Sequence, residues 1–232
     1  METCIPILLL TPPLEETESL LAYMYRAAEA NAYPRFYVGN PLALAHSFLS
    51  LLGDRNLDLS LELRRRLTPA PILAVKRSMK PSFSRLGGDQ LPFSAIRTGT
   101  RNVCPRCLAE QPWCRGEWEL KSYVACGRHG VRLVDQCDKC KGKLYWRRTE
   151  LTRCFCGRSL ADIETRGAVM WETLWSVQVE ISFRESINNF HRLKSQRLTD
   201  TPMRLFHLLE MANAIRAGYY LACSQGDGLS PD

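Results

Sequence analysis

Eight of the ten cysteines lie within a short stretch, between Cys104 and Cys156, while Cys4 and Cys223 stand alone near the two ends. The clustered cysteines fall into two sets. The first set is Cys104-Pro-Arg-Cys107 and, 18 residues later, Cys126-Gly-Arg-His129. The second is Cys137-Asp-Lys-Cys140 and, 13 residues later, Cys154-Phe-Cys156. We interpret the cysteines as metal ligands, because thiols of a reducing compartment seldom form disulfides.

The spacing within each set predicts a closed tetrahedral zinc site. Zinc takes four soft ligands at about 2.0–2.3 Å, and a Cys-x-x-Cys turn supplies two thiolates whose backbone amides can bond the sulfurs. The first set then gives three cysteines and one histidine, and the second gives four cysteines. The Cys154-x-Cys156 spacing is tighter than usual, and Gly157 can relieve the backbone there. We therefore expect two structural zinc ions.

Two alternatives concern which residues share an ion. In an interleaved pairing, Cys104 and Cys107 would share one ion with Cys137 and Cys140. We favour the sequential pairing, because each finger is then a local unit of ordinary size. Cys114 lies inside the first finger and is an alternative ligand there.

A catalytic role for the zinc is not expected. Nucleobase deaminases pair such cysteines with an upstream His-x-Glu, but here His46 is followed by Ser47 and Phe48. Four protein ligands also leave no open position for water. The chain shows no nucleophile-and-base set and no phosphate-binding loop, so we expect a protein without catalytic residues.

The predicted fold class is mainly α with small zinc-stabilised fingers. Residues 1–68 read as a helix-turn-helix-like bundle of three helices, the first over 17–31. The second runs from the N-cap Asn40 to Gly53, and the third starts at Asp58. Any small helical bundle would show a similar pattern.

The rest of the chain divides into four parts. Residues 69–101 are rich in proline, glycine and basic side chains and predict a linker, followed by the tandem fingers over 102–160. Helices are expected over 161–222, with a start at Thr201-Pro202, and a frayed tail over 223–232. The apolar residues expected to be buried in the first of these helices are Val169, Trp171, Leu174, Trp175, Val177 and Ile181.

Charge is concentrated over the fingers. Residues 97–158 hold 14 Lys+Arg and 6 Asp+Glu, and a local excess of about +5 survives after two zinc ions and seven thiolates are counted. Such a patch suits nucleic acid or an acidic protein surface, although a solvated basic face is the alternative. The candidate nucleic-acid contacts are Arg106, Arg115, Lys121, Arg128, Arg132, Lys139, Lys141, Lys143, Arg147 and Arg148.

Two blocks of this sequence resemble the TniQ family. One is the segment Glu18-Ser-Leu-Leu-Ala-Tyr-Met-Tyr-Arg-Ala-Ala-Glu-Ala-Asn31. The other runs from Cys104 to Cys140, with Cys-Pro-x-Cys, Trp118, Cys-x-x-His-Gly, Leu133 and Cys-x-x-Cys. The resemblance covers roughly residues 1–160.

The resemblance implies a target-selection protein of a bacterial transposon. Such proteins connect a target to an AAA+ ATPase regulator, and the target is attachment-site DNA or a CRISPR RNA-guided effector. The modest length favours the adaptor role, in which guide RNA reads the target. A homodimer stays open, and a free-standing zinc-finger DNA-binding regulator is the alternative function.

An adaptor also needs protein-binding side chains. Tyr and Arg dominate binding energy where they fill a partner's pockets, although Tyr23 could equally belong to the core. The candidates near the N-terminus are Tyr23, Arg26, Arg35 and Tyr37. The sequence shows no signal peptide and no apolar run of 18 residues, so we expect a bacterial cytoplasmic protein without a membrane partner.

Overall fold

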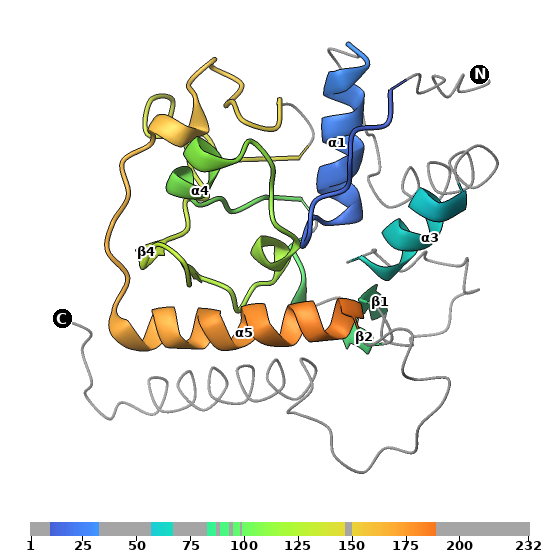
Figure 1. Cartoon of the computed structure of the whole chain (residues 1–232). Coiled ribbons are helices and arrows are strands. Elements are labelled where there is room, and N and C mark those ends of the chain that lie inside the picture. Colours follow the sequence, from blue (N-terminus) through green and yellow to red (C-terminus); the bar gives the residue numbers. More distant parts are fainter. Residues whose placement is uncertain are drawn as a thin grey trace, which may run out of the picture.

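The computed structural model of the chain (Figure 1) describes residues 10–32, 57–66, 83–86, 89–92, 95–97, 99–146 and 150–188. Its elements are three longer helices, three short helical turns and two small antiparallel strand pairs. No helix among these residues is long and apolar enough to cross a membrane.

Helix α1 (Leu20–Ala30) forms where the apolar periodicity predicted it. Ser19 caps its start, because the Ser19 Oγ accepts a hydrogen bond of 3.0 Å from the amide of Ala22. The backbone amide of Asn31 closes the other end. Almost every side chain of the helix is buried, on two different sides, so α1 is an internal element.

Helix α3 (Leu57–Arg65) corresponds to the third helix that the sequence predicted, and it begins one residue before Asp58. Its Leu63 packs with Leu20 and Tyr23 of α1 in a small apolar cluster. The expected second helix, from Asn40 to Gly53, lies outside the described residues. The helix-turn-helix arrangement therefore stays a prediction.

The prediction of an unpacked linker over 69–101 is wrong for its last third. Strands β1 (Phe83–Leu86) and β2 (Asp89–Pro92) form an antiparallel pair with Phe83 opposite Pro92. Leu86 and Leu91 are fully buried in the main core. Burial of apolar side chains from both strands stabilises the β1–β2 pair, although the proline and glycine content of the segment is typical of a linker.

The two fingers are built from short elements, as their size requires. The first holds helix α4 (Pro105–Glu110), the 3-10 turn η2 (Gly116–Glu119) and the strand pair β3 (Ala125–Cys126) and β4 (Val131–Arg132). The second ends at the 3-10 turn η3 (Leu160–Asp162), which packs against α4. The two fingers therefore pack against each other and are not separate units.

Helix α5 (Met170–Asn188) runs along the fingers and reaches β1 (Figure 1). Two glycines permit this close approach. A Cβ on Gly116 would lie 2.7 Å from the ring of Phe183, and one on Gly127 would lie 2.9 Å from the Val177 side chain. No larger residue fits at either place without displacing the helix.

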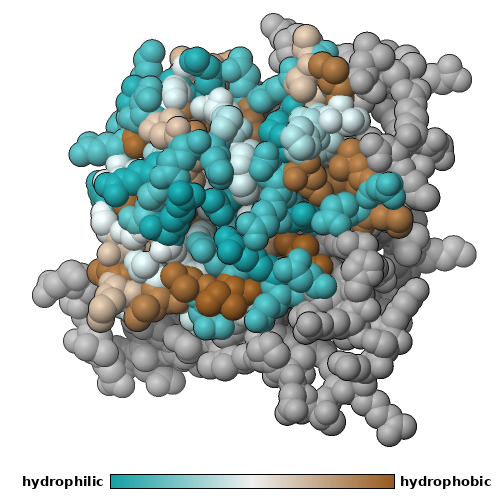
Figure 2. All heavy atoms as spheres, viewed as in Figure 1, coloured by the Kyte–Doolittle hydropathy of each residue, from teal (hydrophilic) through white to brown (hydrophobic). Residues whose placement is uncertain are grey.

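The buried face of α5 is not the one that the sequence analysis expected. The helix buries Ser176, Val179, Ser182, Phe183, Ser186 and Ile187. Trp171, Leu174 and Ile181 are instead 66%, 62% and 47% exposed, and Figure 2 shows a band of apolar atoms over this helix. Phe183 and Val177 meet Gly116 and Gly127 of the first finger, so these glycines make room for this face of the helix.

One hydrophobic core joins the parts that were predicted as separate domains. Leu21 and Tyr25 of α1 lie in the same cluster as Trp118, Trp146 and the buried ligand cysteines of both fingers. Leu21 and Tyr25 of α1 therefore share this main core with the fingers, while Leu20, Tyr23 and Met24 of the same helix pack in the smaller cluster with Leu63 of α3. The predicted helix from 201 and the tail over 223–232 lie outside the described residues.

Candidate metal centres

The first candidate centre brings together the four residues that the sequence grouped. The ligand atoms of Cys104, Cys107, Cys126 and His129 all lie within 4.8 Å of one another. The His129 Nδ1 is 3.5, 3.2 and 3.5 Å from the sulfurs of Cys104, Cys107 and Cys126. In a tetrahedral zinc site, bond lengths of about 2.3 and 2.0 Å place sulfur and nitrogen ligands about 3.5 Å apart. The first set therefore fits zinc.

Helix α4 positions the first half of this centre. Pro105 occupies its first position, directly after Cys104, so the Cys104 sulfur lies at the start of the helix. Hydrogen bonds from the Cys107 and Cys126 thiols, aided by the amides of Arg106 and Cys107, lower the pKa of Cys104, while the contacts with Cys104 and Cys126 raise the pKa of Cys107. The thiolate, the form of cysteine that binds metal, is thus favoured at Cys104.

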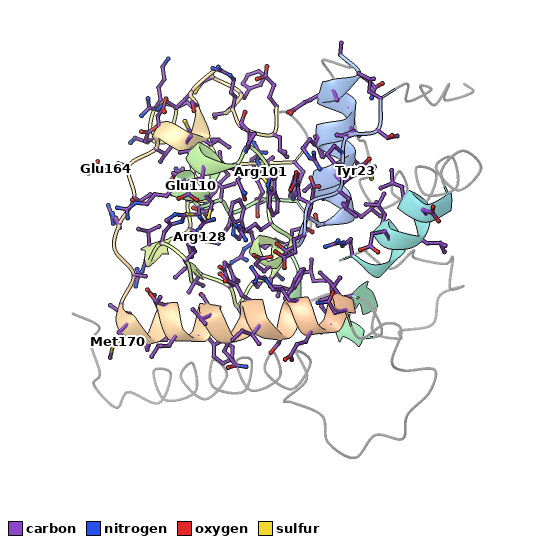
Figure 3. The ribbon with its side chains drawn as sticks, in the orientation of Figure 1. Tyr23, Arg101, Glu110, Arg128, Glu164 and Met170 are labelled. Carbon is purple, nitrogen blue, oxygen red and sulfur yellow. The ribbon has the colours of Figure 1, made fainter. Side chains whose placement is uncertain are left out.

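Glu110, at the end of α4, orients the histidine. The Nε2 of His129 donates to the Glu110 Oε1 at 2.9 Å, which leaves the Nδ1 free to face the three sulfurs. Arg128 holds the other carboxylate oxygen at 2.9 Å. Figure 3 shows Glu110 and Arg128 lying close together beside the first finger. Metal-bound histidines commonly donate to a carboxylate in this way.

The second candidate centre consists of Cys137, Cys140, Cys154 and Cys156, whose sulfurs also lie within 4.8 Å of one another. The Cys137 and Cys156 sulfurs are 3.7 Å apart, and those of Cys140 and Cys154 are 3.6 Å apart. Sulfurs on a tetrahedral zinc ion are separated by roughly 3.8 Å. The second set therefore fits zinc as well.

The second centre is the more exposed of the two. Cys140 is exposed and Cys156 half-buried, whereas the three cysteines of the first centre are all buried. A backbone hydrogen bond from Arg158 lowers the pKa of Cys156 to about 7. The Arg158 side chain holds Asp138 through two hydrogen bonds of 3.1 and 3.0 Å, which ties the two halves of this finger together.

Each finger thus gathers its own ligands, and the described structure does not support the interleaved pairing. Cys114 is not near either ligand set: it is buried, and burial raises the pKa of its thiol to about 12. It is a core cysteine. The finger loops of 18 and 13 residues are short enough for each site to close locally.

Arg101, which was not among the residues predicted to be functional, holds the segment before the second half-site of the second finger. Arg101 is 2% exposed, and its guanidinium donates to the carbonyls of Leu151, Glu150 and Arg153 at 2.7, 3.1 and 3.2 Å. It also lies over the Trp146 ring. The segment it holds leads directly into Cys154. Nothing in the sequence distinguished this arginine from the basic residues around it.

The candidate nucleic-acid residues divide by whether they are neutralised within the chain. Arg128 pairs with Glu110, Arg132 with Glu172 and Lys143 with Asp135. Arg115 is largely buried against Glu117 and the Trp113 ring. Among the described residues, four of the candidates are exposed and make no ion pair: Arg106, Lys121, Lys139 and Lys141. Arg147 and Arg148 lie outside the described residues.

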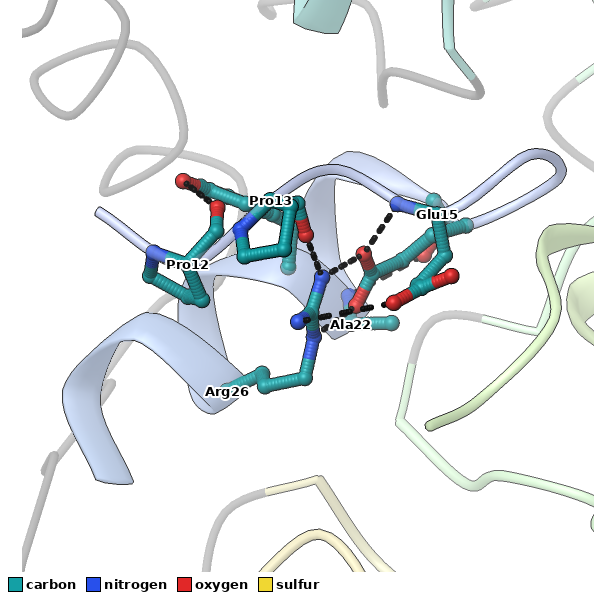
Figure 4. Close-up of polar contacts among 8 residues, drawn as sticks. Pro12, Pro13, Glu15, Ala22 and Arg26 are labelled. Carbon is teal, nitrogen blue, oxygen red and sulfur yellow. Dashed lines mark hydrogen bonds and ion pairs between the residues drawn. The ribbon is translucent and has the colours of Figure 1, made fainter. Parts of the chain in front are cut away.

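The expected partner-binding role does not suit the two candidates that the structure describes. Tyr23 is fully buried, and its hydroxyl donates to the Pro12 carbonyl at 2.9 Å. The guanidinium of Arg26 donates to both Glu18 oxygens, at 2.9 and 2.5 Å, and to the Pro13 carbonyl (Figure 4). Both side chains hold the segment before α1 in place, so neither is an exposed anchor. Arg35 and Tyr37 lie outside the described residues.

These features define a mainly helical protein with two clusters of four Cys or His side chains, each of which could hold a metal ion. The TniQ family model matches residues 9–133, more than half of the chain. The chain therefore belongs to the TniQ family, whose members are transposition-associated targeting proteins. The match ends before the second cluster. The comparison with curated proteins gave no match.

Proposed function

We propose that this protein is a non-enzymatic targeting adaptor for DNA transposition in the bacterial cytoplasm. It would link a target-bound complex, either attachment-site DNA or a CRISPR RNA-guided effector, to an AAA+ ATPase regulator. The observation that carries the proposal is the family match over α1 and the first finger, residues 9–133.

The two clusters support a structural role for zinc in this adaptor. Both ligand sets have four protein ligands at separations that suit tetrahedral zinc. A fully ligated ion has no position for a reacting water, so the zinc would stabilise the fold rather than perform chemistry. Since the three cysteines of the first cluster are buried in the main core, loss of that ion would disturb the described unit.

The free cations support contact with nucleic acid. Arg106, Lys121, Lys139 and Lys141 are exposed and unpaired among the described residues. Lysine and arginine contact phosphate without reading sequence, which suits a protein that positions a complex. The alternative, a free-standing DNA-binding regulator, would require selective binding to one duplex.

Two measurements on the full chain separate these functions. An adaptor should retain an AAA+ ATPase encoded beside it in a pull-down, and a matched sample stripped of zinc by chelator should lose it. A regulator should instead shift one duplex far better than a scrambled competitor at physiological salt. Selective duplex binding without ATPase retention would overturn the adaptor proposal.

A further inference from the structure

The tip of the second finger carries an exposed aromatic ring. Phe155 is 75% exposed, although a large apolar side chain normally avoids water. It stands between Cys154 and Cys156, so a ligand residue on each side fixes its backbone. The ring is therefore held outward by the same residues that form the cluster.

Two unpaired lysines lie on the same tip. Lys139 and Lys141 flank Cys140, whose sulfur is 3.6 Å from that of Cys154, the neighbour of Phe155. Both lysines are exposed and make no ion pair among the described residues. Lys141 has a φ of 57°, and its amide donates to the Cys137 carbonyl at 3.0 Å, so the turn that carries both ammonium groups has a defined shape.

The charge of the surrounding segment favours an anionic ligand. Residues 137–158 contain seven basic and two acidic residues. Four thiolates and one zinc ion would remove two of these positive charges, which leaves an excess of about +3. An exposed ring and free ammonium groups on one finger match a nucleotide strand, because a base offers a flat face to the ring and the phosphates attract the cations.

The strand state of the ligand follows from the ring. In a duplex, neighbouring bases cover both faces of each base, so an outward phenyl ring can stack only on an unpaired, unstacked base. Phosphate contacts alone would not make this distinction. A surface with ring and cations together is thus suited to a single strand.

We propose that the tip formed by Lys139, Lys141 and Phe155 binds single-stranded nucleic acid, with a base stacked on Phe155 and phosphates on the two lysines. The inference rests on the proposed function only in the contact with nucleic acid. It does not depend on the ATPase partner. The competing role for the lysines is neutralisation of the four thiolates of the second centre.

The test measures binding of the full, zinc-loaded chain to fluorescein-labelled 16-nucleotide oligo-dT, oligo-U and a 16-base-pair duplex by anisotropy. Stacking of one base predicts that Phe155→Leu weakens single-strand binding by about 5- to 150-fold. The variant keeps an apolar side chain and should retain two zinc ions and the duplex affinity. Comparison of oligo-dT with oligo-U shows which strand is preferred, and loss with either one supports the proposal.

Matched controls come from elsewhere in the chain. Trp171→Leu changes another exposed aromatic, on α5, and should leave single-strand binding unchanged. Lys139→Gln/Lys141→Gln should lower the slope of log affinity against log salt by about 1.4, since each phosphate contact contributes about 0.7 on a single strand. Lys121→Gln, on the first finger, should leave the reduction caused by Phe155→Leu unchanged.

Three results would overturn the proposal: unchanged single-strand binding in Phe155→Leu, an equal loss on the duplex, or an equal loss in Trp171→Leu. If Lys139→Gln/Lys141→Gln instead lowers zinc affinity without changing the salt slope, the two lysines neutralise the thiolates of the second centre rather than bind phosphate. The proposed adaptor function would survive each of these results, because ATPase retention is measured separately. Conversely, if the wild-type chain retains no ATPase but Phe155→Leu weakens single-strand binding, the result supports the nucleic-acid site and contradicts the adaptor function.

Discussion

Arg101 offers the sharpest test of how the fold supports the second metal centre. Its guanidinium donates to three backbone carbonyls in residues 150–153, immediately before Cys154. The substitution Arg101→Met keeps an apolar stem against Trp146 but removes every donor. The turn then loses the partners that hold it against the core, while no metal ligand is altered.

The expected loss can be worked out from these contacts. The bond to the Leu151 carbonyl is buried and the other two are partly buried, so one carbonyl is left unsatisfied and two become partly hydrated. An unsatisfied buried group costs about 1–3 kcal/mol, and the relief of burying the charge offsets part of the total. We expect a net loss of about 1–3 kcal/mol, which corresponds to about 5- to 150-fold weaker zinc binding if the whole loss falls on the second centre.

Stepwise competition with a chromophoric zinc chelator measures this effect. The wild type should release the ion of the more exposed second centre first, and Arg101→Met should lower that affinity while the first centre is nearly unchanged. Arg97→Met is the matched control, because Arg97 also donates to backbone carbonyls, those of Trp118 and Lys121, but beside the first finger. The reasoning is refuted if Arg101→Met weakens both centres equally or weakens neither.

Three further predictions concern the metal ligands and a buried acid. Elemental analysis should give two zinc ions per chain. Cys140→Ser should lose one of them, while Cys107→Ser, in the shared core, should unfold the protein; full zinc content in both variants would contradict the ligand assignment. Glu110→Ala should weaken the first site by about 10- to 100-fold, measured with the same chelator, and an unchanged affinity would show that the carboxylate does not orient His129. Burial raises the pKa of Glu119 to about 8, above its value of 4.5 in the unfolded chain. The free energy of unfolding therefore falls as pH rises from about 4.5 to about 8, by about 1.4 kcal/mol per pH unit, because the carboxyl loses its proton in the unfolded chain but keeps it when buried. Glu119→Gln should therefore flatten the fall of the thermal midpoint between pH 6.5 and 8.5, and an unchanged slope would exclude Glu119 as its source.

The ligand sets illustrate what could be predicted from sequence. Cys104 and Cys107, or Cys137 and Cys140, are three residues apart, so local backbone geometry alone brings their sulfurs together. The loops between half-sites are short, and closing them locally costs little entropy. The existence of α1 was similarly local, because its apolar periodicity lies within the helix itself, although the helix begins at Leu20, three residues after the expected start.

The role of each basic residue could not be predicted from its neighbours in the sequence. Arg26, Arg101 and Lys139 look alike in sequence, yet the first binds Glu18, the second is buried against carbonyls and the third is exposed. Each outcome depends on which distant backbone or carboxylate lies nearby. Composition could predict a basic region but not which cations remain free to bind a partner.

The orientation of α5 also required the tertiary structure. Its sequence carries an apolar stripe with Trp171 and Leu174 and a second stripe with Ser176, Val179 and Phe183, and hydrophobicity favoured the first for burial. The fingers present Gly116 and Gly127 to the helix, and Phe183 and Val177 approach these glycines closely, so the shape of the finger surface selects the buried face. The sequence by itself thus determined the metal ligands and α1, since both depend on neighbours along the chain. Tertiary packing decided the face of α5, the burial of Tyr23 and the position of Arg101, since these depend on the shape of surfaces that meet only in the fold.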